Sequence, residues 1–156
     1  MNAFDILNYG NQTVLHTLEG IPDNQWQTSG VCGYWSVKDI MAHLASYEQV
    51  LTEVLNGVLD GGPGSTLEKY RTLTDFNDSE VNRRASKTPR EVLAEYQEAC
   101  ACNMDLVTKI PPEIRRENGT LPWYGMEYSL EDFLVYAFYG HKREHSAQIA
   151  LFKDTL

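Results

Sequence analysis

Apolar residues recur at helical spacing in four long segments of the chain. In residues 2–20 they fall on one face, formed by Phe4, Leu7, Val14, Leu15 and Leu18. Residues 36–59, 88–110 and 129–153 show the same periodicity, and a shorter polar stretch, 67–84, is compatible with a further helix. No stretch alternates apolar and polar residues as a half-buried strand does. The pattern predicts an all-α protein whose four long helices form a four-helix bundle.

Start and stop signals support these boundaries. Ser36 and Asp39 approximate a capping box, and Ser129 with Asp132 repeats that spacing. Thr88, Pro89 and Glu91 give the clearest start, with an N-cap threonine, proline at the first helical position and glutamate at the third. The Gly61-Gly62-Pro63-Gly64 run ends the second helix, and Pro111-Pro112 ends the third. The connection before Ser129 is longer than a bundle needs, and long ordered loops are often functional.

Length and charge narrow the class of protein. The 156 residues show no composition break, which predicts one domain over residues 1–156. The net charge of −9 argues against binding to nucleic acid or to an anionic membrane surface. No apolar run is long enough to span a membrane, and residues 1–5 lack the features of a signal peptide, so we expect a cytoplasmic protein. An odd number of cysteines, three, argues against a disulfide framework.

The last helix carries the most informative polar residues. At 100° per residue, His141, His145 and Gln148 share its apolar face with Leu134, Phe138 and Ile149. Lys142, Arg143, Glu144 and Lys153 are predicted to lie outside that face. Burying two imidazoles and an amide without partners costs about 1–3 kcal/mol for each unsatisfied group. The nitrogens of these side chains therefore need either a metal ion or hydrogen-bond partners.

Histidine spacing makes a metal site plausible. His141 and His145 are one helical turn apart and can converge on one ion if a third ligand arrives from elsewhere. His43, at the margin of the apolar stripe of the second helix, is the candidate third ligand, although a histidine in such a place is more often hydrogen bonded. His16 falls opposite the apolar face of the first helix and is predicted to face solvent.

A site with three histidines leaves coordination positions open, as catalytic metal sites do. Imidazole ligands suit zinc, nickel, iron or copper. Gln148 is the candidate catalytic residue, since it can orient a metal-bound water or a substrate; the alternative is a hydrogen bond to nearby backbone. Glu48 and Glu144 are possible partners for imidazole N–H groups. Tyr47, one turn after His43, can line the pocket or simply pack.

Two segments resemble a known family. WSVKDIMAHL (residues 35–44) and HKREHSAQI (residues 141–149) are similar to the two signatures of the DinB/YfiT-like metalloenzyme superfamily. That superfamily includes the amino-terminal domain of mycothiol-dependent maleylpyruvate isomerase and the bacillithiol transferases. The resemblance follows the order of elements along nearly the whole chain.

The resemblance implies a fold, a metal and an activity. The implied fold is an up-down-down-up four-helix bundle with a long crossover, usually homodimeric. The family's metal-binding histidines match His43, His141 and His145 here, which implies a divalent transition metal such as zinc, nickel or iron. Members with assigned activity use the metal to activate a low-molecular-weight thiol for transfer or isomerisation of a small molecule.

Three functions remain open from the sequence. The first is a metal-dependent thiol transferase or isomerase acting on a small electrophile. The second is a bundle that binds a metal or ligand without turnover, for stress response or sequestration. The third is a structural bundle whose histidines are hydrogen bonded internally.

Overall fold

The computed structural model of the chain describes residues 2–62 and 64–156. This part of the chain contains no β-strand, and one isolated bridge joins Cys32 to Trp35. The elements are α1 (Ala3–Leu18), η1 (Asp23–Gln25), α2 (Val37–Asp60), α3 (Ser65–Thr72), α4 (Phe76–Arg83), α5 (Pro89–Lys109), α6 (Pro112–Arg116), α7 (Leu130–Leu134), η2 (Val135–Gly140) and α8 (His141–Lys153). The prediction of an all-α protein is confirmed.

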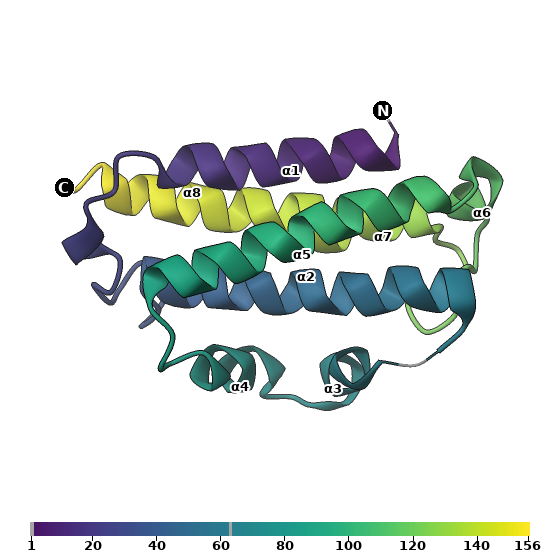
Figure 1. The fold of residues 1–156 in the computed structure, drawn as a ribbon, viewed down its shortest axis with the longest axis horizontal. Helices are drawn as coiled ribbons and strands as arrows, with labels where there is room; N and C mark the ends of the chain where they lie inside the picture. The colour runs from purple at the N-terminus through teal and green to yellow at the C-terminus, as the bar shows by residue number, and fades with distance from the viewer. Residues whose placement is uncertain (1, 63) are drawn as a thin grey trace.

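The long helices lie roughly parallel to one another (Figure 1). α1 packs against α8 and α5, and α2 packs against α5. By colour, α1 and the continuous α7–η2–α8 rod run from right to left in Figure 1, whereas α2 and α5 run from left to right. The crossover from α2 to α5 carries α3 and α4, which lie along the outer side of α2.

The predicted helix starts are confirmed. The side chains of Ser36, Thr88 and Ser129 each accept a hydrogen bond from a backbone N–H three residues on. The carboxylates of Asp39, Glu91 and Asp132 accept the N-cap N–H in return. Each capping box satisfies two backbone donors that a helix leaves unpaired at its start.

The predicted ends of the helices agree less closely with the structure than the predicted starts do. α1 begins at Ala3 with Asn2 as its N-cap, and it ends at Leu18 rather than Gly20. Phe4, predicted to lie on the buried face, is exposed. At the end of α2, Gly61 adopts the left-handed conformation (φ 74°) that favours glycine. Pro63, part of the predicted stop signal, lies outside the described residues.

The prediction of one polar helical stretch over residues 67–84 is wrong, because the crossover forms two short helices. Leu73, just after α3, has extended backbone dihedrals and ends that helix. Glu53 of α2 accepts hydrogen bonds from the backbone N–H groups of Thr66 and Leu67 at the start of α3. Phe76 of α4 is buried in the core. Each short helix is therefore fixed separately against α2.

The last helix is interrupted by a π-helical segment, η2, which the sequence analysis did not predict. A π-helix bonds residue i to i+5, so it adds about one residue to a turn and shifts the later residues around the axis. Lys142, predicted to lie outside the buried face, is for this reason only 2% exposed. Phe138, His145, Ser146 and Ile149 share the buried face with it.

The core consists of two apolar clusters along the length of the bundle. The first apolar cluster includes Leu7, Leu51, Leu55, Phe133 and Phe138. The second includes Val14, Met41, Leu44, Tyr96 and Ile149. Cys100 is a buried member of this cluster, and Cys102 is exposed. Both cysteines and Cys32 are free, as the odd number of cysteines predicted.

An ion-pair cluster ties α4 to α5. The buried guanidinium of Arg84 contacts Glu80 at 2.8 Å and Glu95 at 2.6 Å, and Lys87 contacts the second oxygen of Glu95 at 2.6 Å. Burial opposes ionisation of Glu95, but hydrogen bonds to Arg84 and Lys87 outweigh it and lower its pKa below the ordinary 4.5.

Glu95→Gln is expected to lower the free energy of unfolding at pH 7 by about 1–2 kcal/mol, because it removes the charge from these hydrogen bonds. Since the folded pKa lies below the unfolded one, the contribution is present above about pH 4.5 and is lost as the pH falls through the folded pKa. Urea unfolding of both proteins at pH 7 and pH 3.5 measures this. A difference that stays the same at both pH values would contradict the assignment.

Candidate metal centre

Three histidines from two helices converge at the interface of α2 and α8. His43 lies in the second turn of α2, and His141 and His145 lie in the first two turns of α8. The Nε2 atom of His141 is 2.8 Å from Nε2 of His43 and 2.9 Å from Nε2 of His145. His43 is 2% exposed and His145 is 6% exposed. The structure thus brings together the three residues that the sequence singled out, in a group that could hold a metal ion.

Hydrogen bonds among the rings alone do not satisfy these nitrogens. Nδ1 of His145 lies 2.8 Å from Oε1 of Gln148, and because an amide oxygen only accepts, the His145 proton sits on Nδ1. Nε2 of His145 therefore presents a lone pair to His141. Nε2 of His141 carries one proton at most for two close Nε2 neighbours. Nδ1 of His43 is buried and has no partner among the described residues. A cation that accepts one lone pair from each Nε2 atom resolves the close approach of these three nitrogens, so the donor set fits a metal.

The protonation of the three rings also suits a metal. Burial, followed by repulsion from the other two rings, lowers the pKa of His43 to about 2. Burial and repulsion from His145 and Lys142 lower the pKa of His141 to about 3, and burial lowers that of His145. All three rings are neutral at pH 7, and neutral imidazole is the form that binds metal.

The partners expected of structural histidines are missing from the described residues. Apart from the Gln148 amide oxygen, no carbonyl or carboxylate oxygen there accepts a hydrogen bond from the ring nitrogens of His43, His141 or His145. His16 behaves as predicted: its side chain is 84% exposed and contacts Glu19 on the surface. The contrast between His16 and the buried three argues against the internally hydrogen-bonded bundle.

Aromatic side chains enclose the histidine cluster on the side of α2. The ring of Tyr47 lies 4.7 Å from that of His43 and 4.5 Å from that of His141, and the ring of Trp35 lies 5.0 Å from His43. Tyr47 therefore contacts two of the histidines as well as packing in the core. Burial raises its pKa to about 12, so its hydroxyl keeps its proton and donates to Asn77 at 3.3 Å.

The crossover contributes to this enclosure, which the sequence analysis missed. Phe76 and Asn77 of α4 and Tyr70 of α3 contact Tyr47. No signal in the sequence assigns these residues to the site, because helical periodicity does not say which long helix a crossover will cover.

The polar residues proposed to assist the histidines have different partners from those predicted. Gln148 binds the His145 ring rather than backbone. Glu48, offered as one of two possible partners for an imidazole N–H, does not take that role: its carboxylate contacts Lys142 at 2.6 Å and Asn103 at 2.9 Å. Glu144 is exposed and makes no hydrogen bond to a ring.

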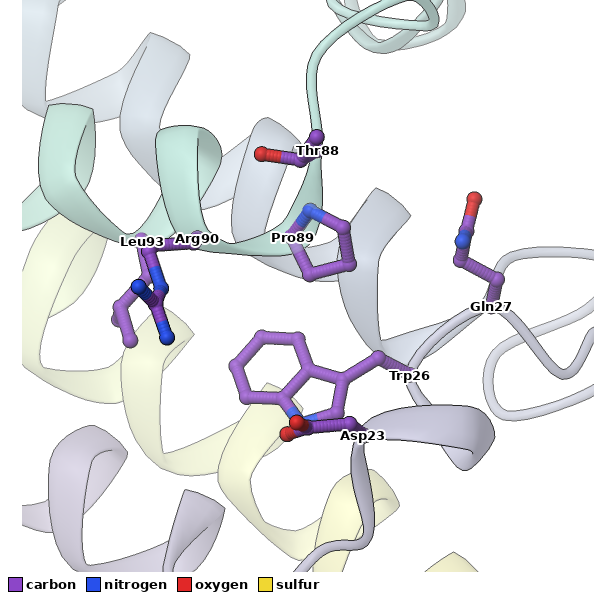
Figure 2. A pocket seen from close by; sticks show the side chains of 7 residues that line it. All are labelled: Asp23, Trp26, Gln27, Thr88, Pro89, Arg90 and Leu93. Atoms are coloured by element: carbon purple, nitrogen blue, oxygen red, sulfur yellow. The ribbon is translucent and has the colours of Figure 1, made fainter.

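A surface cavity of about 350 Å³ lies apart from the histidines, between η1 and the start of α5. Trp26 forms its floor, with Asp23 and Gln27 beside it and Pro89, Arg90 and Leu93 opposite (Figure 2). No histidine lines this cavity.

Among the described residues, no helix is both long and apolar enough to cross a membrane.

Comparison with known proteins matches the chain to a family. The family described as the mycothiol maleylpyruvate isomerase N-terminal domain matches residues 10–127. The matched region runs from within α1 to the loop before α7; it contains His43 and ends before His141 and His145. Neither the curated proteins nor the solved structures gave a match to the chain.

Proposed function

The chain belongs to the family of mycothiol maleylpyruvate isomerase N-terminal domains, and on this basis we propose that it is a metal-dependent enzyme of small thiols. The proposed reaction is transfer of a low-molecular-weight thiol to a small electrophile, or isomerisation with the thiol's help. The observation that carries the proposal is the convergence of three buried, neutral imidazoles through their Nε2 atoms.

The proposed metal ligands are His43, His141 and His145. Three protein ligands leave a coordination position open, which separates catalytic zinc sites from closed structural ones. A divalent metal such as zinc, nickel or iron supplies positive charge that stabilises a thiolate at neutral pH. Gln148 fixes the ring of His145 by accepting from its Nδ1–H, and it is also the proposed catalytic residue for orienting a bound water or substrate.

The surroundings of the site suit this chemistry. Trp35 and Tyr47 place apolar rings against His43 and His141, which lowers the local polarity and strengthens electrostatic interactions there. The Tyr47 hydroxyl is held by Asn77 and stays protonated, so it can donate a hydrogen bond but does not compete as an anion for the metal.

The remaining features of the proposal are based on the family match, the directions of the helices and the net charge of the chain. We propose a single domain with the up-down-down-up topology, an arrangement that the helix directions in Figure 1 support. We also propose a cytoplasmic homodimer. Its partner is proposed to be a small molecule rather than nucleic acid or a membrane, since the net charge is −9.

A second function, binding of a metal without turnover, is favoured by the deep burial of His43 and His145. Little of the surface of these two side chains is accessible to a substrate. A site that only sequesters a metal needs no room for a substrate beside the ion.

Turnover assays separate the two functions. Tag-free protein loaded with zinc, nickel or iron is mixed with mycothiol, bacillithiol or glutathione and a panel of small electrophiles, and thioether product is followed by mass spectrometry. We expect product formation above the background rate in wild type and His16→Ala but not in His145→Ala. Stoichiometric metal in wild type with no rate above that of His145→Ala would favour binding without turnover.

Gln148→Ala is expected to weaken metal binding about tenfold, because the Nδ1–H of His145 loses the acceptor that orients its ring. Competition with a chelator of known affinity measures the change. Gln97→Ala, at an exposed position of α5, is the control and should bind like wild type. Equal affinities of Gln148→Ala and wild type would show that Gln148 does not support the ligand.

A further inference from the structure

A layer of polar side chains separates the two apolar clusters of the core. Each long helix contributes one buried residue to it: Asn11 from α1, Glu48 from α2, Asn103 from α5 and Lys142 from α8. Along each helix these residues fall between members of the first and the second cluster. We call these four residues the polar layer.

The polar layer is closely bonded. Nζ of Lys142 lies 2.6 Å from the carboxylate of Glu48 and donates to Oδ1 of Asn11 at 2.5 Å. Nδ2 of Asn103 donates to both the carboxylate and the backbone carbonyl of Glu48 at 2.9 Å. Lys142 and Glu48 are 2% and 1% exposed. An ion pair this deep is held in one geometry by partners from all four helices.

Stability alone does not account for such a pair. Taking two charges out of water costs about as much as their attraction returns, and apolar residues of similar volume often give equal or greater stability. Buried polar groups are better attested as devices that fix the register of neighbouring helices. The polar layer sits where register matters, because α2 and α8 carry the three histidines.

The pair is also placed next to the histidines in sequence. Lys142 directly follows His141, and Glu48 lies five residues after His43, about 7.5 Å along α2. Among the described residues, two polar side-chain contacts join α2 to α8. One is the approach of His43 to His141, and the other is the Glu48–Lys142 pair.

We propose that Glu48 and Lys142 are positioning residues that set the spacing and register of α2 and α8, and so hold His43 at the right distance from His141 and His145 to share a metal. This inference rests on the proposed metal site. Glu48 and Lys142 do not touch the metal or a substrate; they act through the helices that carry its ligands.

The test replaces the pair without leaving a charge behind. In Glu48→Met/Lys142→Met, Asn103 keeps its bond to the backbone carbonyl of residue 48, and Oδ1 of Asn11 keeps donors from Tyr96 and Cys100. The control is Glu80→Met/Arg84→Met, which removes another buried ion pair that does not involve α8. Glu95, the other partner of Arg84, keeps Lys87 at 2.6 Å.

Two readouts use the metal alone. Zinc affinity is measured by chelator competition, and Co²⁺ absorption bands report the coordination geometry. We expect the Glu48/Lys142 double variant to bind zinc ten to a hundred times more weakly than wild type and to show altered Co²⁺ bands. The control double variant should match wild type in both. A folded Glu48/Lys142 variant with wild-type affinity and wild-type bands would overturn the inference and leave the metal site standing.

A second variant covers the case in which the double variant does not fold. Glu48→Asp keeps the charge but shortens the arm by one methylene, so α2 and α8 must shift for the pair to form. We expect altered Co²⁺ bands and a smaller loss of zinc affinity; unchanged bands and affinity would overturn the inference. If wild type itself bound neither metal, the proposed metal site would fail, and the inference with it.

Discussion

Tag-free His145→Ala is expected to be purified without its transition metal, whereas wild type carries about one ion per chain. His145 supplies one of three converging Nε2 atoms, and its Nδ1 is held by Gln148 so that the lone pair on Nε2 faces the other rings. Zinc sites with four ligands bind with about 10–16 kcal/mol, so one ligand accounts for about 3 kcal/mol, or at least a hundredfold in affinity. Elemental analysis of the purified proteins measures the loss.

His16→Ala is the matched control, since it removes an imidazole that is exposed on α1 and should keep its metal. Added zinc should raise the melting temperature of wild type and His16→Ala, following mass action, but not that of His145→Ala. Wild-type protein that holds no metal and gains none on soaking would contradict the proposed metal site. It would favour a histidine cluster with a purely structural role.

Lys142→Met is expected to destabilise the metal-free protein by about 3–5 kcal/mol. The substitution leaves the Glu48 carboxylate buried without its cation, and an uncompensated buried charge has a cost of that order. For a urea dependence of about 2 kcal/mol per molar, the unfolding midpoint falls by about 2 M. Unfolding in urea, followed by far-ultraviolet circular dichroism in the presence of a chelator, measures the shift.

Two further variants test whether the loss of stability comes from leaving Glu48 without its cation. Arg143→Met changes the neighbouring exposed residue, whose guanidinium donates to the hydroxyl of Tyr139, and should stay within about 0.5 kcal/mol of wild type. Glu48→Met/Lys142→Met should recover most of the stability lost in the single variant, because no lone charge remains. A single Lys142→Met variant as stable as Arg143→Met would mean that water or another group compensates Glu48.

Local signals determined the long helices of this protein. The capping boxes at Ser36, Thr88 and Ser129 and the apolar periodicity of the long helices act within a few residues of chain, so they can be read without knowing the fold. The spacing of His141 and His145 is local in the same sense. Those features placed the starts of the long helices correctly and put two of the three histidines one turn apart on one helix.

The third histidine needed more than spacing. The distance of His43 from α8 depends on packing between segments about a hundred residues apart, and the sequence could only nominate it from its place at the margin of an apolar face. The match between residues 35–44 and a known signature strengthened that nomination, but the 2.8 Å approach of its Nε2 to His141 is a property of the folded bundle.

The tertiary structure alone decided which partners the buried polar groups have. The sequence offered Glu48 as one possible partner of the histidines and placed Lys142 outside the buried face, whereas the fold pairs them with each other. A single π-helical segment before His141 causes the difference for Lys142, because a shift of one residue around the axis exchanges a solvent position for a core position. Helical periodicity specifies a buried face only while the helix stays regular, and a partner across the bundle is set by long-range packing that no local pattern encodes.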